Sequence, residues 1–140
     1  MRSCSLKSFS IFRALVLCAG LLYALGGVAG ESEPQNSEAN GVSISVKPLD
    51  VSAAAATWQF QLALNTHSGA LDDDLTRTAT LVDAAGKPHA AAGWDGDAPG
   101  GHHRKGVLRF NALSPRPGTL EMRIERTGEA APRTFRWTLK

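Results

Sequence analysis

The chain has no cysteine after its first thirty residues. Both cysteines of the 140-residue sequence, Cys4 and Cys18, lie in the N-terminal stretch. Residues 31–140 therefore cannot form a disulfide among themselves, and a hydrophobic core must hold them together. The same absence excludes a cysteine nucleophile, an iron–sulfur cluster and a blue-copper centre from this part of the chain.

A strong excess of either charge is also missing once the N-terminal stretch is set aside. Residues 31–140 carry 12 Lys and Arg and 13 Asp and Glu side chains. Tight binding to a nucleic-acid backbone requires a basic face. We therefore expect no nucleic-acid partner.

No hydrophobic run is long enough to cross a membrane. The apolar stretch within residues 14–25 has about a dozen residues, whereas a membrane-spanning helix needs about 20. It follows the basic residues Arg2, Lys7 and Arg13 and precedes the small residues 28–30. This order is typical of a secretory signal. We predict that residues 1–30 are such a signal and that the product is periplasmic or secreted, with an uncleaved signal as the one open route to the membrane.

The remaining chain divides into a short linker and one domain. Residues 31–40 are polar and acidic and contain no aliphatic side chain larger than alanine. Such a composition cannot bury a core, so we predict a flexible linker here. Residues 41–140 are predicted to form a single domain.

Apolar and polar side chains alternate along most of this domain. The clearest examples are residues 42–46 and 58–65, and the same period of two recurs at residues 76–83, 107–110, 120–124 and 135–139. Turn signals separate these segments, and no segment keeps a helical period. The pattern predicts an all-β fold, an antiparallel β-sandwich of immunoglobulin-like size with six or seven strands. A small β-barrel is the alternative.

Three of the four histidines lie in two unusual segments. His67 follows the strand predicted at residues 58–65, and His102 and His103 precede the strand at 107–110. Strand parity places His67 and His103 on polar faces and His102 toward the core. If the two strands are neighbours, His67 and one of the paired histidines can meet at one end of the sandwich.

Imidazoles gathered in this way suit Cu(II) or Zn(II), with a carboxylate supplying oxygen. We predict a site for a transition-metal ion, copper first and zinc second, that serves carriage or buffering. Its candidate ligands are His67, His102, His103, Asp72 and Asp95. In the alternative interpretation the histidines only cap strand ends through backbone hydrogen bonds. Trp94, in the glycine-rich segment, is either a lid over the end of the domain or part of a binding surface.

Residues 72–74 form an acidic run that lacks the alternation and the glycine of a calcium-binding loop. We expect an exposed turn that caps a short helical turn at Leu75.

Few residues are placed for catalysis. Ser68 is adjacent to His67, and neighbouring side chains diverge on an extended chain. A triad with Ser68 or Ser114 would have to be assembled in space, so we predict no enzyme. The alternative function is a non-catalytic accessory or adhesive envelope domain without metal, with an envelope protein as partner.

Three segments resemble those of a group of small exported prokaryotic domains. That group carries a Thr-His-Ser, a Leu-Asp-x-Asp-Leu and a Gly-Gly-His-His segment, and the resemblance covers most of residues 58–139. The residues at matching places are Thr66, His67, Asp72, Asp74, Gly100, Gly101, His102 and His103. The resemblance implies that these segments form one unit, and it assigns no activity to them.

Overall fold

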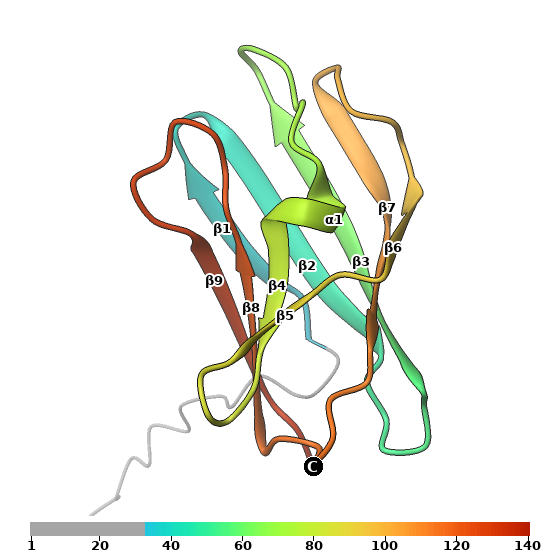
Figure 1. The fold of residues 1–140 in the computed structure, drawn as a ribbon. Coiled ribbons are helices and arrows are strands. Elements are labelled where there is room, and N and C mark those ends of the chain that lie inside the picture. The colour runs from blue at the N-terminus through green and yellow to red at the C-terminus, as the bar shows by residue number, and fades with distance from the viewer. Residues whose placement is uncertain (1–32) are drawn as a thin grey trace, which may run out of the picture.

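The computed structural model describes residues 33–140, and the signal predicted at residues 1–30 lies outside this part of the chain. Two antiparallel sheets pack face to face (Figure 1). The predicted β-sandwich is therefore confirmed, and no closed barrel forms. Within residues 33–140 the one helix has four residues, so no helix there has the length or apolar character to cross a membrane.

The larger sheet has the strand order β1-β2-β3-β7-β6, and the smaller has the order β5-β4-β8-β9. The bounds are β1 (Gln35–Ala39), β2 (Val42–Asp50), β3 (Thr57–Thr66), β4 (Ala79–Val82), β5 (Pro88–Ala90), β6 (Gly93–Gly96), β7 (His103–Asn111), β8 (Thr119–Ile124) and β9 (Arg133–Thr138), with helix α1 (Leu75–Thr78) before β4. Nine strands form where six or seven were predicted. The additional strands β1, β5 and β6 are short and polar or glycine-rich, so they show no hydrophobic alternation.

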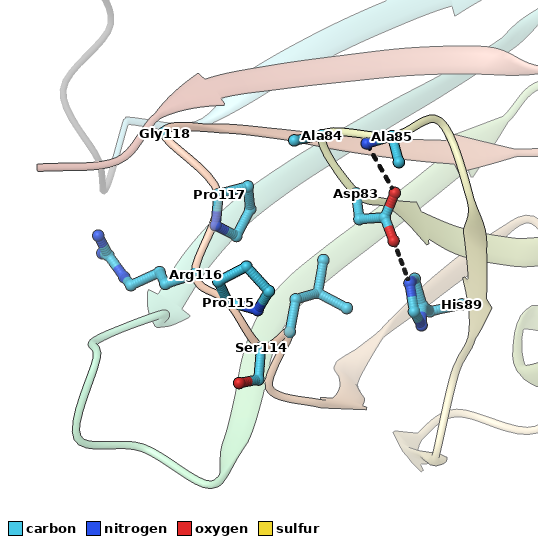
Figure 2. A pocket seen from close by; sticks show the side chains of 10 residues that line it. Asp83, Ala84, Ala85, His89, Ser114, Pro115, Arg116, Pro117 and Gly118 are labelled. Atoms are coloured by element: carbon cyan, nitrogen blue, oxygen red, sulfur yellow. Dashed lines mark hydrogen bonds and ion pairs between the residues drawn. The ribbon is translucent and has the colours of Figure 1, made fainter.

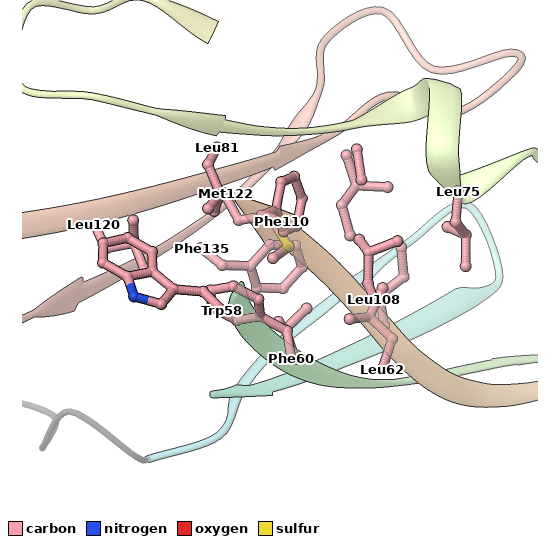
Figure 3. Packing of buried hydrophobic residues seen from close by; sticks show 14 of the residues in the cluster. Trp58, Phe60, Leu62, Leu75, Leu81, Leu108, Phe110, Leu120, Met122 and Phe135 are labelled. Carbon is pink, nitrogen blue, oxygen red and sulfur yellow. The ribbon is translucent and has the colours of Figure 1, made fainter. Parts of the chain in front are cut away.

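The core lies between the two sheets and follows the alternation in the sequence (Figure 3). Trp58, Phe60 and Leu62 on β3 are each at most 1% exposed. The Phe60 ring lies 5.8 Å from the ring of Phe110, edge to face, and 5.8 Å from that of Trp137. Each such pair contributes roughly 0.5–1.5 kcal/mol beyond area burial. Aromatic packing therefore fixes the two sheets against each other.

Strand β1 corrects the prediction that residues 31–40 are a flexible linker. Asn40 and Gly41 both have positive φ, 50° and 72°, and make the tight turn that pairs β1 with β2. The Gln35 amide nitrogen donates to Arg136 O, and Gln35 Oε1 accepts from Arg136 N at 3.0 Å. Main-chain pairing orders this edge strand, and the polarity of its side chains does not reveal such pairing.

Helix α1 begins at the acidic turn, as predicted. Asp74 Oδ1 accepts hydrogen bonds from Thr76 N at 3.0 Å and from Thr76 Oγ1 at 2.6 Å. The hydrogen bond from the Thr76 side chain lowers the pKa of the Asp74 carboxyl. Asp74 is thus the N-cap of α1, and Leu75, its first residue, is buried in the core.

Trp94 on β6 packs against the edge of the core, as the lid interpretation expects. The indole packs partly buried against the core, and its Nε1 donates to Asp97 O at 2.9 Å. Gly96 and Gly106 lie opposite each other beneath it. A Cβ on Gly106 would lie 2.6 Å from Trp94 Cζ2. The two glycines therefore leave the space that the indole occupies.

We expect Gly106→Ala to lower the free energy of unfolding by roughly 1–3 kcal/mol, because overpacking forces the backbone apart. The added Cβ would lie 2.6 Å from Asp95 O and from Gly96 Cα, both main-chain atoms. Gly118→Ala is the control, since a Cβ there meets no atom within 4 Å. Urea denaturation measures both variants, and wild-type stability of Gly106→Ala would show that β6 and β7 are not packed this closely.

Candidate functional site

The hydrogen-bond ladder between β3 and β7 continues into the loops that hold the histidines. Thr66 N donates to His102 O at 2.9 Å, and Leu71 N donates to Gly101 O at 3.0 Å. The two histidine-bearing strands are therefore neighbours, which meets the condition set in the sequence analysis. Both loops lie at the same end of the sandwich (Figure 1).

Arg104 is buried beneath these loops, with 2% of its surface exposed. Its Nη1 donates to Leu71 O at 3.0 Å and to Asp73 O at 2.7 Å. Its guanidinium carbon lies 5.6 Å from the centre of the Trp94 ring. A buried charge is stable only when hydrogen bonds or an opposite charge compensate it, and here carbonyl oxygens and an aromatic face do so. Arg104 thereby ties the loop that contains Leu71 to β7.

Thr66 shapes the turn that carries His67. Thr66 is 3% exposed, and its hydroxyl donates to Ser68 O at 2.7 Å and accepts from Ser68 N at 3.2 Å. These bonds bend the main chain around His67, which is exposed. In the Thr-His-Ser segment, Thr66 therefore organises the turn and the imidazole is left to solvent.

The prediction that His102 faces the core is wrong. His102 is exposed, and β7 begins only at the next residue, His103. The first buried side chain along this strand belongs to Arg104. Gly100 and Gly101, just before the histidines, have φ of 114° and 70°. Strand parity therefore applies from His103 onward and not to the loop before it.

His103 is held by a specific hydrogen bond. Asn65 lies opposite His103 in register, and Asn65 Oδ1 is 2.7 Å from His103 Nδ1. Because a carbonyl oxygen can only accept, His103 Nδ1 must donate its proton. The other ring nitrogen, Nε2, is then the one that carries the lone pair in the neutral imidazole.

The two carboxylates predicted as ligands are placed apart. Asp95 pairs with Arg109 at 3.2 Å and lies opposite Val107. Val107 is four residues along β7 from His103, a separation of about 13 Å at strand spacing. Asp72 is exposed on the loop before α1. Among the described residues no three His, Cys, Asp or Glu side chains are placed to hold one metal ion, so the five predicted ligands do not form one closed site.

A chain of four charged side chains ties the same end of the sandwich together. Asp73 pairs with Arg126 at 2.8 Å, and Arg126 lies 3.6 Å from Glu129. Glu129 in turn pairs with Arg133 at 2.5 Å. All four side chains are at most 9% exposed. The hydrogen bond from Arg133 lowers the pKa of Glu129 below its ordinary value of 4.5.

The sequence analysis missed this ionic chain, although one of its members carried a signal. Arg133 shares strand parity with Phe135 and Trp137, which marks it as facing inward. It is buried, and it donates to Val42 O and Ala39 O, both at 2.7 Å. The other members lie in loops or at strand ends, where no periodic pattern indicates burial.

A pocket of about 320 Å³ opens at the opposite end, between the β4–β5 turn and the β7–β8 loop (Figure 2). His89 lines it, and its Nε2 lies 3.0 Å from Asp83 Oδ2. Asp83 Oδ1 accepts from the main-chain nitrogens of Ala85 and Lys87. The hydrogen bond with His89 lowers the pKa of Asp83. The Ser114 hydroxyl points away from His89 (Figure 2), so it is not set to donate to that imidazole.

We expect Glu129→Gln to make the free energy of unfolding less sensitive to acid. Because the pKa of Glu129 is lowered in the folded protein, its ion pairs stabilise the fold above about pH 4.5, and this contribution is lost as the pH falls further. The variant should be less stable by roughly 2 kcal/mol near pH 7 and closer to wild type near pH 3.

Urea midpoints at the two pH values measure this difference. Glu125→Gln is the control, because Glu125 is exposed at the end of β8. A stability difference between Glu129→Gln and wild type that stays constant from neutral to acid pH would contradict the role given to the carboxylate.

Comparison with known proteins assigns no family and no function to the chain. No family model matches the chain, and no curated protein matches it. The resemblance to the group of small exported domains therefore stays a prediction. What the protein does has to be inferred from the geometry of its two ends.

Proposed function

We propose that the chain is an exported, non-catalytic β-sandwich domain that binds a transition-metal ion through His67 and His103. Copper is the first candidate and zinc the second, and the role is carriage or buffering of the ion. The observation that carries the proposal is the hydrogen bond of 2.7 Å between His103 Nδ1 and Asn65 Oδ1. A metal-binding imidazole commonly donates its other ring nitrogen to an oxygen in this way, which orients the ring and leaves Nε2 for the ion.

The position of His67 supports the same proposal. His67 comes directly after β3, and the main-chain hydrogen bond from Thr66 N to His102 O at 2.9 Å joins the residue before it to the residue before His103. His67 and His103 are therefore both exposed at the same end of two adjacent strands. We infer that these two exposed imidazoles can reach one ion.

An open site fits carriage better than permanent storage. Two imidazoles leave coordination positions to water or to a ligand from another molecule, whereas structural metal sites are closed by four protein ligands. His102 and Asp72, both exposed on the adjoining loops, stay candidates for a further ligand. Borderline imidazole ligands favour Cu(II) and Zn(II) over harder cations.

The alternative is a non-catalytic accessory or adhesive envelope domain that binds a protein partner and no metal. Thr66 and Arg104 favour it, because they build the loops through internal hydrogen bonds without an ion. Under this alternative the exposed histidines would contact the partner. A partner that co-purifies from the native envelope, with no metal by elemental analysis, would favour this function.

Calorimetric titration of the purified protein with Cu(II) and with Zn(II) tests the metal proposal. We expect stoichiometric binding that His67→Ala and His103→Ala each weaken roughly tenfold or more, since each removes one of two protein ligands. His89→Ala is the matched control, because His89 lines the pocket at the other end. Unchanged affinity for both metals in His67→Ala and His103→Ala would end the proposal.

Asn65→Leu tests the orienting hydrogen bond. Removal of the acceptor should let the His103 proton move to Nε2, and metal affinity should fall about tenfold. The ¹⁵N chemical shifts of the His103 ring report the tautomer without any metal present. Gln59→Leu, exposed on the same strand, is the control. If Asn65→Leu leaves the His103 ring nitrogens unchanged, Asn65 does not set the tautomer.

A further inference from the structure

The pocket in Figure 2 lies outside the proposed metal site and has largely apolar walls. Leu113, Pro115 and Pro117 line it from the β7–β8 loop, and Ala84 and Ala85 line it from the β4–β5 turn. Its volume is about 320 Å³. A dry cavity of about 150 Å³ accepts one benzene ring. The pocket therefore has room for a group of one or two rings.

Both segments that form the pocket are tied down. On one side, Asp83 N donates to Lys87 O at 3.0 Å, and Asp83 Oδ1 accepts from Lys87 N at 2.9 Å. On the other side, Arg116 Nη1 donates to Lys140 O at 2.7 Å and Arg116 Nε donates to Val51 O at 3.2 Å. The pocket is thus preformed, and a ligand need not order its walls.

The charged side chains of the pocket are already engaged. The Asp83 carboxylate accepts from His89 and from two main-chain nitrogens, and the Arg116 guanidinium donates to main-chain carbonyls. A charged ligand would therefore gain little from either of them. His89 donates through Nε2 to Asp83, so the neutral ring keeps Nδ1 as a hydrogen-bond acceptor. The polar part of a ligand should then be a donor.

From these constraints we propose that the pocket binds a neutral aromatic group that carries one N–H or O–H donor. Indole and phenol are the simplest examples. The ring packs among the proline, leucine and alanine side chains, and His89 Nδ1 accepts the hydrogen bond. Such a group can arrive as a free small molecule or as a tryptophan or tyrosine side chain of a peptide.

An NMR titration of the ¹⁵N-labelled protein tests the proposal, with indole as the probe. Indole should shift the amide signals of Ala85, His89 and Gly118, and the shifts should saturate. Toluene, which has a ring but no donor, should bind about fivefold more weakly, because it makes no hydrogen bond. N-acetyl-tryptophanamide, titrated in the same way, distinguishes the two kinds of ligand. An affinity equal to that of indole indicates the side chain of a peptide, and a much weaker affinity indicates a free small molecule.

Two variants and one control variant make the outcome decisive. Ala85→Trp should fill the pocket and abolish indole binding, whereas Ala130→Trp, exposed in the β8–β9 turn at the other end, should bind as wild type does. His89→Phe keeps a ring but removes the acceptor, so it should weaken indole about fivefold and leave toluene unchanged.

The pocket would be supported as the site if indole binding is saturable and if, among the variants, only Ala85→Trp abolishes it. The absence of saturable shifts at these amides, or indole binding to Ala85→Trp as tight as to wild type, would overturn it. Wild-type indole affinity in His89→Phe would overturn the hydrogen bond assigned to His89.

Discussion

The buried Arg104 guanidinium determines the form of the end that carries the histidines. It donates hydrogen bonds to the carbonyls of Leu71 and Asp73, and an apolar side chain at this position would remove both of them. The Trp94 indole lies beside it, over space that Gly96 and Gly106 leave open. The main-chain hydrogen bonds, the Arg104 guanidinium and the Trp94 indole thus hold the loops in place. The imidazoles take no part in these contacts.

Side chains and a short connection link the two sheets at their lateral edges. On one side, Gln35 bonds to the main chain of β9, and Arg133 spans from β9 to Ala39 and Val42. On the other side, the chain itself crosses from β5 to β6 within a few residues.

The sequence predicted the elements whose side chains alternate, because one face of each is buried: β2, β3, β8 and β9 follow that pattern. It did not predict β1, which is held by main-chain bonds that its polar side chains do not reveal. The prediction that His102 faces the core was wrong because the alternation of β7 was extended backwards into the loop that Gly100 and Gly101 bend. The hydrogen bond from His103 to Asn65 joins residues 38 apart, and only the register of β3 against β7 brings them together.

The central claim is that folding brings His67 and His103 to one end of the sandwich as a pair of ligands. A crystal structure of the protein with bound zinc or copper, located by anomalous scattering, tests it most directly. We expect the ion within about 2.0–2.1 Å of an imidazole nitrogen of each residue, with His103 still bonded to Asn65. An ion bound elsewhere while these two imidazoles remain unligated would contradict the claim.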